Sequence, residues 1–122
     1  MTRINAGIPP KQLCRQHLLA ELREIKRIPN TLEKANLKDL PTKFCLGTGH
    51  VRFFYDKGCY TLIRYLQLYN EAQARGYNVT DFSTAWCVYD KYPKLFNGWE
   101  PTDADRQLVE ARIAERLKTM KP

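Results

Sequence analysis

Long apolar segments are absent from this sequence of 122 residues, and so are internal repeats and low-complexity runs. Its apolar runs are only a few residues long, whereas a membrane-spanning helix needs roughly 20 apolar residues. The first residues also lack the apolar stretch that is typical of a signal peptide. We therefore expect a single domain over residues 1–122, no membrane partner and a cytoplasmic location.

Motifs for metal and hydrolytic chemistry are missing as well. The four cysteines are far apart, with no C-x-x-C pair and no histidine at zinc-ligand spacing: Cys14, Cys45, Cys59 and Cys87. Neither His17 nor His50, the only histidines, belongs to an H-E-x-x-H motif or a nucleophile elbow. Gly47-x-Gly49 lacks the third glycine of a dinucleotide-binding loop and predicts a tight turn. We expect reduced, buried thiols, hydrogen-bonded structural histidines, no metal and no cofactor.

The charge of the sequence is strongly positive. Twenty Lys and Arg residues stand against 13 Asp and Glu residues, which gives a formal net charge of +7. Such an excess on a small domain indicates a polyanionic partner, and nucleic acid is the commoner one where no basic amphipathic anchor is present. We expect DNA or RNA binding that weakens as salt increases.

The first third of the chain predicts an extended arm followed by a helix. Gly7 and Pro9-Pro10 exclude a helix over residues 1–10. A helix is expected from about residue 10 or 11, with an apolar stripe of Leu18, Leu22 and Ile25. Pro29 should kink or end this helix, and Asn30 is a candidate N-cap for a short second segment.

The remainder predicts two more long helices separated by loops. Residues 36–55 are predicted to be irregular, with a short extended segment over residues 51–55. A helix is then expected over residues 57–75, ending at Gly76. Its expected inward face carries Leu62, Leu66 and Tyr69. Residues 77–101 form a long connection with seven aromatic side chains, either pinned onto the core or stacking unpaired bases.

The capping sequence Thr102-Asp103-Ala104-Asp105 predicts the start of the last helix. The side chains expected to point inward from this helix are Val109, Ile113, Leu117 and Met120. Together these patterns predict an all-α fold, a compact single domain of three main helices with long ordered loops.

Polar side chains gather on one face of the first helix. Helical spacing allows Gln16, His17, Arg23, Glu24 and Arg27 to share one broad surface, with the two arginines one turn apart. Either this surface grips phosphates, or it is a solvated helix face with ordinary ion pairs. In the last helix Arg112 and Arg116 are also one turn apart and present the same alternative.

The second residue offers a further reactive group. Thr2 is small enough for the initiator methionine to be removed, which would leave Thr2 with the free α-amine of the chain. An α-amine has a pKa of about 7.7–8.0 in model peptides, and nearby positive charge lowers that pKa. Arg3 is adjacent, and Arg23 and Arg27 are candidates for the same role. An amine of this kind can form an imine with a sugar C1′.

Several segments together resemble one family, the pyrimidine-dimer DNA glycosylase/AP lyase family typified by enzymes of T-even phages. The similarity runs from residue 1 to about residue 117 in the same order. Its segments are Met1-Thr2-Arg3-Ile4-Asn5, Gln16-His17-Leu18, Ala20-Glu21-x-Arg23-Glu24, Gly47-x-Gly49-His50-Val51-x-Phe53-Phe54-Tyr55-Asp56-Lys57, Arg75-Gly76-Tyr77-Asn78 and Ala111-Arg112.

The resemblance implies an arm that threads between helices and a DNA repair enzyme that acts on ultraviolet pyrimidine dimers. It implies that the Thr2 α-amine attacks C1′ and that the resulting imine undergoes β-elimination, with Glu24 as the catalytic carboxylate. It assigns DNA binding to Arg3, Gln16, His17, Arg23, Arg27, Arg112 and Arg116. The expected partner is double-stranded DNA with damaged bases, bound by a monomer, in the host cytoplasm if a phage encodes the protein.

Two alternatives keep the fold. One is an AP lyase or glycosylase for abasic sites or another modified base, and the other is a non-catalytic DNA-binding relative. The family prototype ends in an aromatic and basic tail associated with dimer recognition, whereas this sequence ends with Lys118-Thr119-Met120-Lys121-Pro122. A substitute for that tail is expected, if anywhere, between Trp86 and Trp99.

Overall fold

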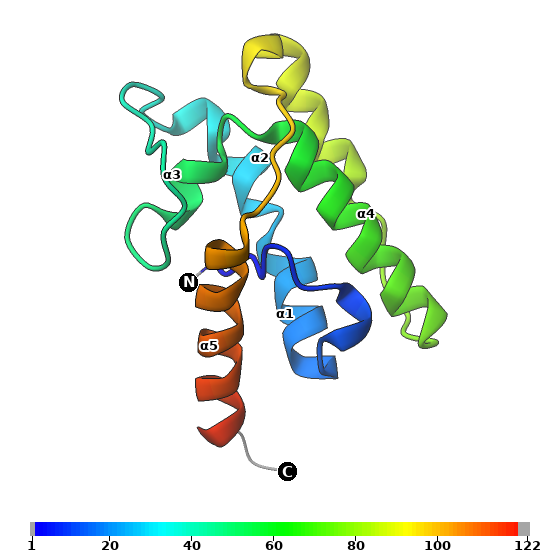
Figure 1. Ribbon diagram of the computed structural model, residues 1–122. Coiled ribbons are helices and arrows are strands. Elements are labelled where there is room, and N and C mark those ends of the chain that lie inside the picture. Colours follow the sequence, from blue (N-terminus) through cyan, green and yellow to red (C-terminus); the bar gives the residue numbers. More distant parts are fainter. Residues whose placement is uncertain (1, 120–122) are drawn as a thin grey trace.

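The computed structural model describes residues 2–119 (Figure 1). Within these residues it contains five α-helices, four short 3-10 helices and no β-strand, with one isolated antiparallel bridge between Lys57 and Phe96. The predicted all-α class is therefore confirmed. The three longest α-helices are α1 (Arg15–Glu24), α4 (Gly58–Ala74) and α5 (Asp103–Thr119).

The amino-terminal arm is extended and largely buried. Ile4, Ala6 and Ile8 belong to the core, and the arm ends in the short 3-10 helix η1 (Pro10–Gln12). In Figure 1 the arm runs between α1 and α5, as the resemblance implied. Gly7 has a φ of +81°, and a Cβ atom at this position would lie 2.2 Å from Cγ of Arg106. Only glycine allows this bend so close to α5.

The first predicted helix is divided into two. The separate turn η1 precedes α1, and α2 (Arg27–Thr31) follows it after a break at residues 25 and 26. Pro29 explains the break, because it has no N–H to donate to the carbonyl of Ile25 four residues earlier. Ile28 donates to that oxygen instead, at 3.1 Å. Asn30 lies inside α2 and does not cap it, so that expectation was wrong.

Residues 50–55 fold differently from the prediction. They contain the helix α3 (His50–Phe54), which follows the 3-10 helix η2 (Leu32–Lys34) and a long loop. The adjacent Phe53 and Phe54 are both buried, which a helix permits and a strand with alternating faces does not. The predicted tight turn is confirmed, since Gly47 and Gly49 have φ angles of +74° and +90°.

The helix α4 has nearly the predicted bounds but buries another face. Gly76 ends it with a φ of +83°, and Gly76 N–H donates to the carbonyl of Gln73. Leu66 is 38% exposed, so its expected inward position was wrong, whereas Leu62 and Tyr69 are half-buried against the core. The side chains that α4 buries are Thr61, Arg64, Tyr65, Leu68 and Ala72. Because Arg64 lies on this face, the spacing of the apolar residues did not predict it.

The aromatic connection after α4 is pinned onto the core. It contains η3 (Ser83–Lys91) and η4 (Pro93–Leu95), which the sequence did not predict. The indole N–H of Trp86 donates to Oγ1 of Thr61 at 3.0 Å, and the Tyr89 hydroxyl donates to the Tyr55 carbonyl at 2.9 Å. The structural alternative is therefore confirmed for the two most buried aromatic side chains of this segment.

The last helix, α5, begins with the predicted cap. Thr102 Oγ1 accepts from the N–H of Asp105, whose carboxylate accepts from the N–H of Thr102. Val109 is buried and Ile113 is half-buried, but Leu117 is 48% exposed, contrary to the prediction. Met120 lies outside the described residues. Val109 and Ile113 thus attach α5 to the core, and Figure 1 shows this helix beside the arm.

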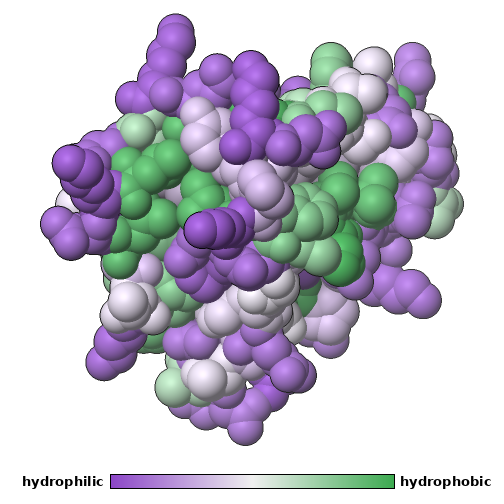
Figure 2. Space-filling view, turned by 90° about the horizontal axis from the view of Figure 1, so that it is seen from above, coloured by the Kyte–Doolittle hydropathy of each residue, from purple (hydrophilic) through white to green (hydrophobic). Residues whose placement is uncertain are grey.

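The surface mixes polar and apolar side chains. On the face seen from above, apolar patches alternate with hydrophilic side chains (Figure 2). Among the described helices, none is both long enough and apolar enough to cross a membrane. The four cysteines are free, but three are half-buried and Cys87 is exposed, so the expectation of buried thiols was wrong.

Candidate active site

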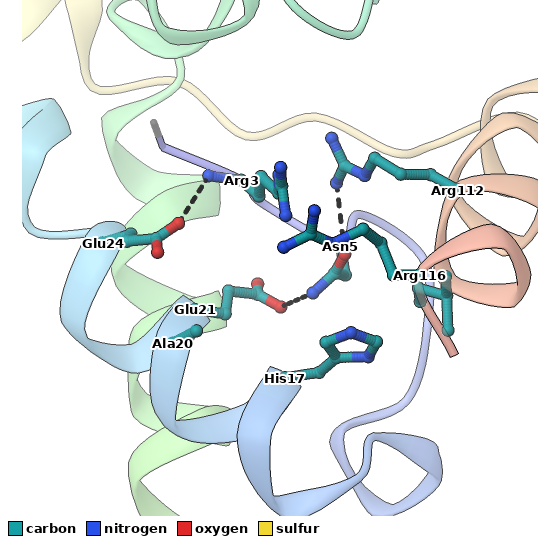
Figure 3. Close-up of a pocket in the computed structure, with 9 residues that line it drawn as sticks. Arg3, Asn5, His17, Ala20, Glu21, Glu24, Arg112 and Arg116 are labelled. Carbon is teal, nitrogen blue, oxygen red and sulfur yellow. Dashed lines mark hydrogen bonds between the residues drawn. The ribbon is translucent and has the colours of Figure 1, made fainter. Parts of the chain in front are cut away.

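Two hollows meet where the arm passes α1. The larger has a volume of about 540 Å³ and is lined by Thr2, Arg23, Glu24, Lys26, Arg27, Asn30 and Thr31. The smaller, of about 40 Å³, is lined by Arg3, Asn5, His17, Ala20, Glu21, Glu24, Arg112, Ile113 and Arg116 (Figure 3). Glu24 belongs to both, so it stands between the two groups of candidate residues.

The Glu24 carboxylate is bonded to the arm itself. Its Oε1 accepts from the backbone N–H of Arg3 at 3.0 Å, and Nη2 of Arg23 lies 3.6 Å from its Oε2. Thr2, which directly precedes Arg3, is only 5% exposed. The candidate nucleophile and the candidate carboxylate therefore lie in neighbouring positions of the same hollow.

Asn5 forms a second anchor of the arm and joins α1 to α5. Its amide nitrogen donates to Oε1 of Glu21 at 2.9 Å, and its amide oxygen accepts from Nη2 of Arg112 at 3.1 Å. The same nitrogen of Arg112 also lies 3.4 Å from the carbonyl oxygen of Ile4. Burial lowers the pKa of Arg112, and the positive charge of the nearby Arg3 lowers it further. This arginine therefore holds the arm, a role that the sequence did not predict for it.

A buried ion pair that the sequence analysis missed lies beneath these contacts. Nε and Nη2 of Arg64 donate to the Glu21 carboxylate at 2.7 and 3.0 Å, and Nη1 donates to the carbonyl of Ile8 at 2.6 Å. Burial disfavours the charge of Arg64, but the Glu21 carboxylate and, to a smaller extent, Tyr60 together outweigh burial and raise the pKa of Arg64. Glu21 lies three residues after Leu18, on the apolar side of α1. A carboxylate at such a position signals a buried cationic partner.

His17 faces the smaller hollow. Its Nδ1 is buried and has no hydrogen-bond partner among the described residues. Burial lowers the pKa of His17, and the charges of Arg116, Arg3 and Arg112 lower it further. The ring is therefore held in its neutral form, able to donate from one nitrogen and accept at the other.

The remaining predicted residues form a basic rim. Arg23 and Arg27 are exposed at the larger hollow, and Arg116 is exposed beside the smaller one. Figure 3 shows Arg112 and Arg116 reaching from α5 toward Arg3 and Asn5 of the arm. Gln16 is exposed on α1 but lines neither hollow. Eight of the nine predicted site residues are thus brought together around Glu24.

The described residues contain no group of three or more His, Cys, Asp or Glu side chains that could hold a metal ion. The charged and titratable side chains that line the two hollows are two carboxylates, an imidazole, a lysine ammonium and several guanidinium groups. Residues 1–84 match the family model for pyrimidine dimer DNA glycosylase. The matched range includes the arm, Glu24 and α1 to α4, whereas Arg112 and Arg116 follow it.

Proposed function

This chain belongs to the pyrimidine dimer DNA glycosylase family, and from that premise we propose that the α-amine of Thr2 is its nucleophile. Membership makes it a DNA repair glycosylase whose substrate is damaged DNA. The finer proposal is that it excises the base at an ultraviolet pyrimidine dimer and then nicks the strand as an AP lyase. Both steps use protein from which Met1, a residue outside the described range, has been removed.

The main support is the contact between Arg3 N–H and Oε1 of Glu24 at 3.0 Å. Because Thr2 immediately precedes Arg3 and lines the same hollow as Glu24, its nitrogen and a carboxylate oxygen can work on one sugar. The hollow of about 540 Å³ is open enough for a nucleotide to approach. A carboxylate beside an amine can accept and return a proton without leaving its hydrogen bond to the arm.

The proposed chemistry proceeds through an imine. The amine nitrogen forms a bond to C1′ as the bond from C1′ to the base breaks. The base leaves with the bonding electron pair, and the proton lost by the amine passes to the Glu24 carboxylate. Glu24 assists the opening of the sugar ring by moving a proton to O4′, which leaves a C1′ imine. Loss of a proton from C2′ then expels the 3′ phosphate, which cleaves the strand by β-elimination.

Arginines provide the proposed grip on DNA. Arg23 and Arg27 border the larger hollow, while Arg3 and Arg116 border the smaller one with His17. Contacts to phosphates position a duplex without reading its sequence, and an enzyme that acts on a base must also take that nucleotide out of the stack. We propose that Arg112 contributes through its charge while it holds the arm, and that Gln16 contacts DNA outside the hollows.

Borohydride trapping tests the amine mechanism. Protein that begins at Thr2 should form a covalent adduct with duplex DNA containing either a thymine dimer or an abasic site. Glu24→Gln should bind the dimer duplex without efficient turnover. Adducts with abasic DNA alone would select the alternative substrate, and no adduct with either duplex would refute the mechanism. The intact mass of the cellular protein provides an independent check, because retained Met1 would indicate the non-catalytic alternative.

A further inference from the structure

The buried imidazole of His50, in α3, accepts a hydrogen bond from the arm. The backbone N–H of Ile4 donates to Nε2 of His50 at 2.9 Å, and Nδ1 of His50 lies 2.9 Å from the carbonyl oxygen of Cys45. Ile4 is 0% and His50 is 2% exposed. Since Nε2 accepts from an N–H group, the hydrogen of the neutral ring must be on Nδ1, where it is donated to Cys45.

The His50 ring has a fixed place in the core. It meets the rings of Phe44 and Phe54 edge to face, with centroid distances of 5.7 and 5.2 Å. His50 is also the first residue of α3, directly after the left-handed Gly49. The accepting nitrogen is therefore fixed by the turn, by the Cys45 contact and by aromatic packing, and the N–H of Ile4 has to meet it there.

We propose that His50 is a positioning residue for catalysis, which holds Ile4 and so sets where the α-amine of Thr2 lies relative to Glu24. This inference rests on the proposed function. Arg3 has its backbone bond to Glu24, the group proposed to move protons. The arm therefore needs a second anchor that does not take part in the reaction. His50 provides it at Ile4, the residue that follows Arg3.

The environment of the ring keeps this anchor intact at neutral pH. Burial lowers the pKa of His50, and Arg112 of α5 lowers it too, whereas the contact with the Cys45 backbone and the charge of Glu21 on α1 raise it. The net shift is downward, so the neutral ring persists. Protonation would place an N–H group against the N–H of Ile4 and break the contact.

Two substitutions separate the hydrogen bond from the packing. His50→Phe keeps an aromatic ring but removes the acceptor, whereas the side-chain oxygen of Gln in His50→Gln can take the place of Nε2. The first measurement is amide hydrogen exchange at Ile4, with Leu68 in α4 as an internal reference. We expect His50→Phe to speed exchange at Ile4 by at least about tenfold without affecting Leu68, and His50→Gln to retain protection.

The second measurement is the single-turnover rate of adduct formation with abasic duplex DNA. We expect His50→Phe to lower this rate about 10- to 100-fold at unchanged DNA affinity, and His50→Gln to restore most of it. Full exchange protection together with a wild-type rate in His50→Phe would overturn the inference. Equal losses in the Phe and Gln variants would do so as well, because packing alone would then explain them.

The experiment still tests the role of His50 if a variant does not fold or if the amine mechanism is refuted. If His50→Phe does not fold, His50→Asn replaces it, since its shorter side chain can reach Cys45 but not Ile4. If the wild-type protein forms no adduct, the amine mechanism is refuted and the catalytic part of the inference with it. Exchange at Ile4 would then still decide whether His50 holds the arm.

Discussion

Arg64→Met should destabilise the protein far more than the loss of any surface charge. Arg64 is 4% and Glu21 is 0% exposed at the side chain, and their closest contact is 2.7 Å. The substitution leaves the Glu21 carboxylate buried without its cation, which costs about 3–5 kcal/mol. The full stability of a domain this size is about 6–18 kcal/mol, so a large fraction would be lost.

Thermal unfolding followed by circular dichroism measures this effect. With an unfolding entropy of about 2.1 cal/mol/K per residue, each kcal/mol corresponds to about 4 °C, so Tm should fall by about 12–20 °C. Lys91→Met is the matched control, because it breaks a pair with Glu33 at 3.5 Å that is 70% and 52% exposed. Its cost should be below about 1 kcal/mol.

A second control replaces both partners. Removing Glu21 and Arg64 together, each by Met, leaves no unpaired charge, so most of the stability lost in Arg64→Met should return. A Tm change in Arg64→Met as small as that in Lys91→Met would refute the reasoning. So would a double variant as unstable as the single one, because the unpaired carboxylate could not then be the cause.

Three further predictions concern the site. Glu24→Gln should slow single-turnover base release by about 10²- to 10⁴-fold while duplex affinity, measured by fluorescence anisotropy, stays within about twofold. Arg116→Gln should reduce the slope of log affinity against log salt by about 0.9 without a change in Tm, whereas Arg112→Gln should also lower Tm, because it loses its contacts with the arm. Both His17 and His50 have lowered pKa values in the folded protein. Below about pH 6.5 the unfolded chain therefore binds more protons than the folded protein does. The urea concentration at the unfolding midpoint should be highest above that pH and should fall as the pH drops through the lowered pKa values. A midpoint that does not change with pH would contradict this prediction.

The outline of the fold was predictable where local signals were strong. The cap at Thr102 and the glycine at position 76 were identified from residue type and spacing, and both have the expected backbone bonds. The break before α2 was not placed correctly, because a proline acts on the carbonyl four residues earlier. The buried face of α4 was missed since Arg64 interrupts its apolar pattern, and only tertiary pairing with Glu21 makes that position internal.

The candidate site was predictable in its charges but not in its anchors. Helical spacing placed Arg23, Glu24 and Arg27 on one surface, and they do line one hollow. Asn5, Glu21 and His50 could not be connected from the sequence, since their contacts span 16 to 107 residues. Such pairs depend on how the arm and the helices come together.

The buried charges make most sense as devices that fix the arm. An ion pair in a core is often no more stabilising than apolar residues of the same volume, so stability alone does not account for Glu21 and Arg64. Their bonds extend to Asn5 and to the carbonyl of Ile8, two points along the arm. An apolar pair could fill the same space but could not fix the register of an extended segment, because apolar contacts have no direction. A chain terminus is ordinarily mobile, so a terminal amine can serve as a nucleophile only if directional bonds of this kind hold the residues behind it.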